Sequence, residues 1–211
     1  MTPVELLQGV HVRFEKNTDY PDSTEEDHVV RVAYMNDAID TLEKEALEGV
    51  NWDFLKTSAS MTFSGTGTDT LPSDFLTFLR VGNSASLKIG NATYTETSSS
   101  EGNMLANNGE KGAYVMWIEG TNLRTYPEAS GTITVTYIKH ATRYPLGTEV
   151  TTLEIPRPLF IQEYILANLY LDDGNVNQYN AHMNIAKDQL DTMRLNTLIN
   201  RNEQNNFAFG L

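Results

Sequence analysis

Hydrophobic positions recur at helical spacing near the start of the chain. Thr2-Pro3-Val4-Glu5 combines a capping residue, a proline at the first helical position and a glutamate three residues after the cap. These residues predict a short helix over about residues 3–14. A second helix is predicted from Ser23, with Glu26 in the capping-box position, because apolar residues then recur every three or four positions as far as Leu47.

The period of the pattern changes to two from Ala59 onwards. Short alternating runs between Gly, Asn and Ser turns predict strands at Met61–Phe63, Phe78–Val81, Ser86–Ile89, Ala92–Thr95, Tyr114–Ile118 and Thr132–Ile138. No helix-length pattern separates these strands, so a parallel doubly wound sheet is excluded and a small antiparallel sandwich or barrel is expected. The polar segment from Ser98 to Asn108 is interpreted as a loop.

Helical spacing returns in the last quarter of the chain. Two prolines close the β-region, and nearly all-apolar residues from Leu159 to Leu171 predict one helix, followed by a second from Val176 to Ile199. From Arg201 the sequence is rich in Asn and Gln and loses helical periodicity. We therefore expect an extended tail, in which the large side chains alternate and share one face: Phe207, Phe209 and Leu211.

These patterns predict an α+β fold in which N- and C-terminal helices form a helical bundle and a small antiparallel β-sandwich or barrel is inserted between them. The expected domains are an N-terminal helical part (1–56), an antiparallel β-domain (57–155), C-terminal helices packing on the N-terminal ones (156–200) and an extended tail (201–211). Composition agrees: residues 57–154 hold 28 Ser and Thr and the rest of the chain holds 7, and hydroxyl and β-branched residues suit pleated surfaces.

Composition and charge exclude several classes of protein. The chain has 211 residues, no cysteine and a net charge of −13, so disulfides and thiolate sites are absent and binding to duplex DNA through phosphate contacts is not expected. No run approaches the roughly 18 apolar residues of a membrane span. The first residues lack the basic start and continuous apolar stretch of a secretory signal, so we expect none.

The search for catalytic chemistry yields no motif. The four histidines are scattered, and the sequence contains no Walker loop, no G-x-G-x-x-G and no G-x-S-x-G. Three acids, Asp53, Asp74 and Glu154, could converge as paired carboxylates for glycosidic chemistry, although nothing in their spacing supports this. We therefore predict no catalytic residue, no cofactor and no metal site.

Two features remain that could serve binding. Trp52 ends the long N-terminal helix and Phe75 follows a short turn into the β-region, so the pair is predicted to anchor helix against sheet, with a binding role as the alternative. The apolar tail with Phe207, Phe209 and Leu211 is either a frayed terminus or a strand or hook donated to a neighbouring protein. Both readings of the tail stay open.

The order of the pieces resembles a known family. An acidic two-helix start, Gly49-Val50-Asn51-Trp52-Asp53-Phe54, Leu71-Pro72-Ser73-Asp74-Phe75 into a short β-domain, Ile155-Pro156-Arg157-Pro158-Leu159 into two closing helices, and an apolar tail are similar to the head-to-tail adaptor (connector) proteins of tailed bacteriophages. The resemblance is one of layout, and the adaptors of short-tailed phages are the most similar.

This resemblance implies a non-enzymatic structural protein of the virion, made in the host cytoplasm. It implies a dodecameric homo-oligomeric ring that binds the portal protein and the tail nozzle (tail tubular) protein, with no membrane contact. Genomic DNA would pass through the ring during ejection without specific binding. Some adaptors of this class are credited with peptidoglycan hydrolysis, but no residue in this sequence supports carrying that activity over.

An anionic wall would suit such a channel, because it repels DNA phosphates. Acids of the long N-terminal helix are therefore predicted to contribute to a negative lumen, with an ordinary solvated helix face as the alternative: Glu25, Asp37, Asp40, Glu43 and Glu48. A rival reading of the whole chain is a carbohydrate-binding β-module whose aromatic platform is formed by Tyr94, Tyr114, Trp117 and Tyr126. A cell-wall hydrolase is a third reading.

Overall fold

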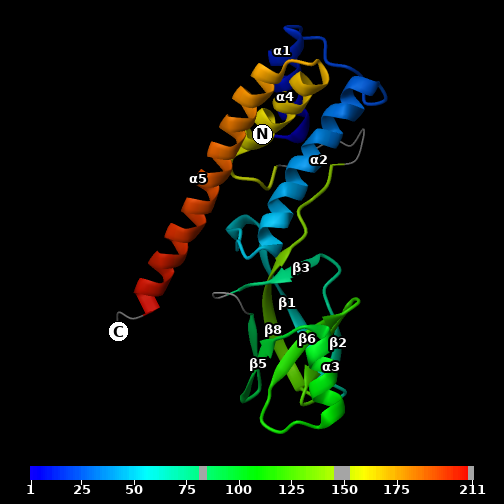
Figure 1. The fold of residues 1–211 in the computed structure, drawn as a ribbon, viewed down its shortest axis with the longest axis vertical. Helices are drawn as coiled ribbons and strands as arrows, with labels where there is room; N and C mark the ends of the chain where they lie inside the picture. The colour runs from blue at the N-terminus through cyan, green and yellow to red at the C-terminus, as the bar shows by residue number, and fades with distance from the viewer. Residues whose placement is uncertain (81–84, 145–152, 209–211) are drawn as a thin grey trace. The chain divides into compact units, whose positions relative to one another are not determined.

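The computed structural model describes residues 1–80, 85–144 and 153–208, with side chains described as far as Leu198. Helices lie at both ends of the chain and strands between them (Figure 1), which confirms the predicted α+β class. The helices and strands are α1 (Pro3–Glu15), α2 (Glu26–Leu47), the 3₁₀ turn η1 (Asp53–Leu55), β1 (Lys56–Ser64), β2 (Thr68–Thr70), β3 (Phe75–Phe78), β4 (Ser86–Ile89), β5 (Ala92–Glu96), α3 (Ser99–Asn108), β6 (Val115–Glu119), β7 (Asn122–Tyr126), β8 (Ser130–Lys139), α4 (Pro158–Asp172) and α5 (Val176–Ala208).

The chain divides into two compact units. Unit 1 comprises Met1–Glu45, Trp52–Phe54 and Ala141–Leu211, and it therefore brings the helices from both ends of the chain together. Unit 2 comprises Ala46–Asn51 and Leu55–His140, and it holds the strands and α3.

Local sequence explains where α1 and α2 begin. The side chain of Thr2 accepts a hydrogen bond from the Glu5 backbone N–H at 3.2 Å, and the Glu5 carboxylate accepts one from the Thr2 N–H at 2.7 Å, so the predicted capping box is present. In α2 the cap lies one residue earlier than predicted. Glu25, rather than Glu26, reaches back and accepts a hydrogen bond from the backbone N–H of Asp22 at 2.9 Å.

Helix α4 is the central element of unit 1. It packs on α5 along most of its length and also contacts α1. Its buried side chains lie around its circumference, and a helix that is apolar on all sides is stable only when it is covered on all sides. They are Phe160, Ile161, Glu163, Ile165, Leu166, Ala167 and Leu169.

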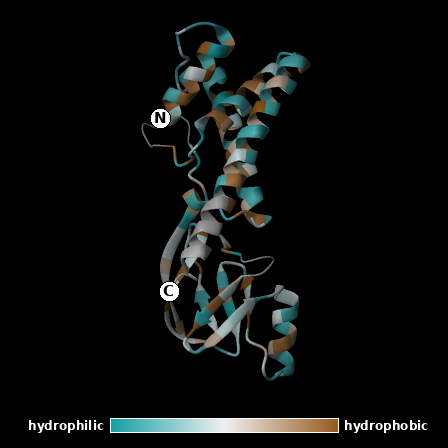
Figure 2. Cartoon of the chain, turned by 90° about the vertical axis from the view of Figure 1, so that its left-hand side faces the viewer, coloured by the Kyte–Doolittle hydropathy of each residue, from teal (hydrophilic) through white to brown (hydrophobic). Residues whose placement is uncertain are grey.

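Unit 2 is built from two sheets around one hydrophobic core. One sheet has the order β1-β8-β3 and the other the order β2-β7-β6-β5-β4. Hydrophobic and polar positions alternate along the strands (Figure 2), and the apolar ones meet between the sheets. The fully buried residues of this core include Met61, Phe63, Phe78, Ile89, Tyr94, Met116, Leu123, Val135 and Tyr137.

The predicted loop from Ser98 to Asn108 is wrong, because the segment folds as helix α3. Ser98 caps the helix by accepting a hydrogen bond from the Glu101 N–H at 3.2 Å, and Gly109 ends it in the left-handed conformation at φ 64°. Both signals are present in the sequence. The many Ser and Asn residues between them concealed the helical pattern.

Helix α3 also changes the expected topology. It connects β5 to β6, and these two strands pair in parallel, Thr95 opposite Val115, whereas the sequence predicted an antiparallel domain. The other strand pairs are antiparallel. A helix between sequential strands permits the parallel pairing, because such a crossover needs a dozen or more residues.

Several further elements differ from the prediction. Strands β2 and β7 were not predicted. The strand predicted at Phe78–Val81 is β3, which starts at Phe75 and ends at Phe78, while Val81 lies outside the described residues. Helix α5 continues to Ala208, so the expected extended tail is wrong as far as that residue. No proline or glycine interrupts the chain from Arg201 to Ala208, and Asn and Gln are tolerated within a helix.

Candidate functional site

Arg143 ties the segment after β8 to helix α2 within unit 1. Its guanidinium forms ion pairs with Asp40 and with Glu43, the latter at 2.9 Å. The other oxygen of Glu43 accepts a hydrogen bond from the Ala141 N–H at 2.8 Å. Glu43 is only 7% exposed, so its carboxylate offers little surface to a channel, and its place among the channel acids stays a prediction. Its carboxylate is a structural ligand of the backbone and of Arg143.

The other predicted channel acids are exposed. Glu25 is held by its capping bond at the start of α2, and Asp40 is exposed although paired with Arg143. Asp37 and Glu48 also face solvent, Asp37 in unit 1 and Glu48 in unit 2. The structure therefore leaves four of the five acids available for an anionic surface.

Arg194 lies at the end of the part of α5 that packs against the other helices of unit 1. Its Nε donates a hydrogen bond to Glu45 of α2 at 2.6 Å, and its Nη1 pairs with Asp191 at 2.5 Å. The hydrogen bond to Glu45 is the main reason that the pKa of Arg194 is raised. The side chains of Leu195 and Leu198, just beyond it, are 58% and 54% exposed. The part of α5 whose side chains are described therefore ends with large apolar side chains in solvent.

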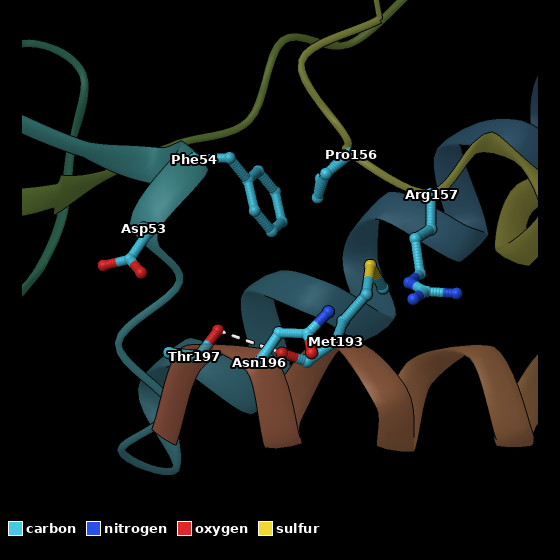
Figure 3. A pocket seen from close by; sticks show the side chains of 7 residues that line it. All are labelled: Asp53, Phe54, Pro156, Arg157, Met193, Asn196 and Thr197. Atoms are coloured by element: carbon cyan, nitrogen blue, oxygen red, sulfur yellow. Dashed lines mark hydrogen bonds between the residues drawn. The ribbon is translucent and has the colours of Figure 1, made fainter. Parts of the chain in front are cut away.

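A cavity of about 570 Å³ opens beside this part of α5 (Figure 3). Phe54 and Pro156 face the buried side chain of Met193 across it. Arg157, at its rim, donates a hydrogen bond to Gln189 at 3.0 Å. The cavity has a mixed lining, in which Asp53, Asn196 and Thr197 accompany the apolar side chains.

A buried carboxylate joins three helices of unit 1. Glu163 of α4, with 2% of its side chain exposed, pairs with Arg13 of α1 at 2.7 Å and with His182 of α5 at 2.6 Å. The imidazole of His182 also stacks on Tyr170, with ring centroids 5.2 Å apart. This arrangement satisfies a charge that would be costly to bury alone, so its role is structural.

Helices α1 and α2 meet around two buried histidines. The hydroxyl of Tyr20 lies 3.0 Å from Nδ1 of His28, and the ring of His11 packs edge-on against Tyr20. Arg31, 1% exposed, pairs with Glu15 at 3.2 Å. Burial, and then the positive charge of Arg31, lower the pKa of His28, while burial raises the pKa of Tyr20 to about 12.

The lowered pKa of His28 predicts a loss of stability in mild acid. The folded state binds this proton less readily than the unfolded chain, so the contribution of neutral His28 is complete above its ordinary pKa of 6.5 and declines as the pH falls below it. Thermal unfolding at about pH 7 and about pH 5.5 measures the effect. The unfolding midpoint should fall more in the unaltered chain than in His28→Gln, and equal falls would contradict the assignment.

The three acids considered for glycosidic chemistry have structural surroundings. Asp74 accepts a hydrogen bond from the Tyr137 hydroxyl at 2.7 Å, and burial together with this bond raises the pKa of Tyr137 to about 12. Glu154 accepts a bond from the Thr142 N–H at 3.3 Å. Asp53 is exposed. Within the described ranges, no group of three or more His, Asp or Glu side chains could hold a metal ion.

The aromatic platform expected of a carbohydrate-binding module is not formed. Trp117 and Tyr94 are 3% and 4% exposed and belong to the interior of unit 2. Only Tyr114 of the four residues is well exposed, and Tyr126 is half-buried. The aromatic residues that alternate along these strands are core residues.

Trp52 and Phe75 are each packed within their own unit. Trp52 is fully buried in unit 1 and donates a hydrogen bond from its indole N–H to the backbone carbonyl of Leu42 at 2.8 Å. In unit 2, Phe75 contacts Phe78 edge-on and Tyr137. Their joint role as an anchor between helix and sheet stays a prediction.

The ion pairs of Arg143 and Arg194 with acids of α2 join residues that are far apart in the sequence, so no local pattern predicts them. Arg143 and Glu43 are 100 positions apart, and Arg194 and Glu45 are 149 positions apart.

The side chains of Phe207, Phe209 and Leu211, the predicted docking residues, lie outside the described residues.

Comparison with known proteins identifies the family of the chain. No curated protein matches the chain. A family model described as SU10 adaptor protein matches residues 1–206, which is nearly the whole chain. In the described residues, no helix combines the length and the apolar character that crossing a bilayer requires. The chain therefore belongs to the SU10 adaptor protein family, and it is an adaptor protein of a bacteriophage.

Proposed function

We propose that this protein forms the adaptor ring between the portal and the tail of a phage of the short-tailed class, and that it lines the channel through which DNA passes. The match of the adaptor family over residues 1–206 carries this proposal. The partners would be the portal protein, the tail nozzle or tail tubular protein and further copies of this chain in a dodecameric ring. The protein would be a component of the virion neck made in the host cytoplasm.

The surface of the subunit supports a passive role. The chain carries a net charge of −13, and Glu25, Asp37, Asp40 and Glu48 are exposed. If these acids face the lumen, DNA phosphates are repelled at every position and slide without being gripped. No enzymatic activity or cofactor is proposed, because Asp74 and Glu154, two of the three carboxylates considered as catalysts, accept hydrogen bonds within the fold.

The end of α5 is the proposed docking element for the portal or an adjacent subunit. Leu195 and Leu198 are exposed beyond Arg194, beside the cavity around Met193. Phe207, Phe209 and Leu211 continue the apolar character of this end of the chain. Burying large apolar side chains on a partner is a standard source of docking energy.

Deletion of residues 207–211 should weaken docking and leave the subunit folded. The deletion removes three large apolar side chains and none of the residues described in either core, so portal binding should fall by roughly tenfold or more. Binding assays with purified portal rings measure the affinity of docking, and circular dichroism checks that the subunit stays folded. Electron microscopy of the same mixtures shows whether a ring forms and whether the acids line its channel. The double variant Asn205→Ala/Asn206→Ala is the matched control. Unchanged portal affinity after the deletion would overturn the docking role.

A further inference from the structure

Strand β1 forms a long, regular edge of its sheet. In the order β1-β8-β3 it is paired on one side only, and its nine residues, Lys56–Ser64, pair with β8 in an uninterrupted register. The opposite edge, β3, has four residues and a register shift between Phe75 and Thr77. Among the described residues, no backbone hydrogen bond joins the outer side of β1 to another strand.

The sequence features that usually protect an edge strand are absent from β1, although β2 of the other sheet lies in contact with β1. Natural sheets shield such edges with proline, with bulges or with several charged side chains, because unpaired N–H and C=O groups accept another strand. β1 contains no proline and no bulge, and its single charge is Lys56 at one end. Every second residue of a strand directs its backbone N–H and C=O to the same side, so about four residues of β1 offer pairing groups outward.

The exposed face beside this edge is uncharged. Ser58, Ser60 and Thr62 are exposed on β1, and two of them pair with hydroxyls of β8: Ser58 with Thr136 at 2.9 Å and Thr62 with Thr132 at 3.0 Å. Neither β1 nor β8 contains an acid, although the whole chain has 28. Copies of a strongly anionic chain repel each other over most of their surfaces. This edge is a place where that repulsion is weak.

We propose that the outer edge of β1 pairs with an edge strand of a neighbouring copy, so that the sheets of adjacent subunits join. The proposal rests on the ring of the proposed function and names its contact. A contact between β1 of one copy and a different edge strand of the next copy is heterologous, because the two copies contribute different surfaces. Such a contact, repeated around an axis, forms a ring when the rotation closes. Backbone hydrogen bonds supply the affinity, and the small hydroxyl side chains let a second strand approach.

Hydrogen exchange of backbone amides tests the pairing directly. In free subunits, the outward amides of β1 should exchange with the solvent much faster than the inward ones, which are bonded to β8. In rings of the unaltered full chain, assembled alone or on purified portal rings, exchange of these outward amides should slow by roughly a hundredfold or more. Amides of β8 that are bonded to β1 or to β3 should change little.

Two double variants separate the edge from the face. Ser60→Lys/Thr62→Lys adds two charges along the edge. Thr134→Lys/Thr132→Lys adds the same charges at the directly opposite positions of β8, away from the outer edge of β1. All four residues are exposed, and both variants remove the same hydroxyl pair, so monomer stability should be similar. Assembly should weaken by roughly tenfold in the edge variant and much less in the control.

Each outcome has a definite meaning. Rings in which the outward β1 amides still exchange fast, or equal assembly of the two double variants, would overturn edge pairing and leave the adaptor ring intact. Protection of β1 only after the tail nozzle protein is added would also overturn it, since the occupant would then be another protein. Failure of the unaltered chain to form a ring on portals would refute the proposed function itself, together with this inference.

Discussion

Trp52→Ala is expected to lower the free energy of unfolding of unit 1 by about 4 kcal/mol. The indole is fully buried, and its N–H is bonded to the Leu42 carbonyl at 2.8 Å. The substitution therefore opens a large cavity and also removes one hydrogen bond from the Leu42 carbonyl, which adds to the cost. Chemical denaturation followed by far-ultraviolet circular dichroism measures the loss, because most helices belong to unit 1.

Two related variants divide this effect into its parts. Trp52→Phe keeps most of the apolar volume and removes the donor, so a loss of about 1–2 kcal/mol is expected. Phe54→Ala removes the neighbouring half-buried ring, 5.7 Å from that of Trp52, and should cost less than Trp52→Ala. A cost of Trp52→Ala no larger than that of Phe54→Ala would show that the indole is not the main packing residue of this region.

The second large effect is expected from Gly102→Ala in helix α3. Replacing glycine by alanine inside a helix ordinarily stabilises it by about 1 kcal/mol. Here a Cβ at residue 102 would lie 2.4 Å from ring atoms of Trp117, which is itself buried in β6. Helix α3 must then move away from the sheet, and we expect unit 2 to lose about 2–3 kcal/mol.

The matched control for this prediction lies in the same helix. Ser100 is exposed in α3, so Ser100→Ala should leave stability unchanged or raise it slightly. Thermal unfolding of both variants, with Trp117 fluorescence as a local reporter of unit 2, gives the comparison. If Gly102→Ala were as stable as Ser100→Ala, the close approach of α3 to Trp117 would be refuted.

The fold class could be read from the sequence because the two periodicities are strong. Thr2, Pro3 and Glu5 fix the start of α1 through contacts within four residues, and such local signals survive in any context. Helix α3 was missed although Ser98, Glu101 and Gly109 carry the same kind of signal. The Ser- and Asn-rich composition of that segment is typical of a loop and hides these signals.

Other features depend on parts of the chain that are distant in sequence. The parallel pairing of β5 and β6 follows from the presence of α3 between them, so one wrong assignment produced two errors. Three-residue β2 is too short to show a period. An acid such as Glu43 looks the same as Asp37 on a helical wheel, and only the distant Arg143 and the Ala141 N–H distinguish a buried ligand from an exposed charge.

Helix α5 is one continuous rod of 33 residues, which spans about 50 Å. Its first half is fixed by α4, by Glu163 through His182, and by Glu45 through Arg194. About 20 Å of helix extends beyond Arg194. A tilt of about ten degrees at Arg194 would swing the far end sideways by about 3–4 Å. A small change in the packing around Arg194 would therefore move the end of α5 by several ångströms, with no change to either core.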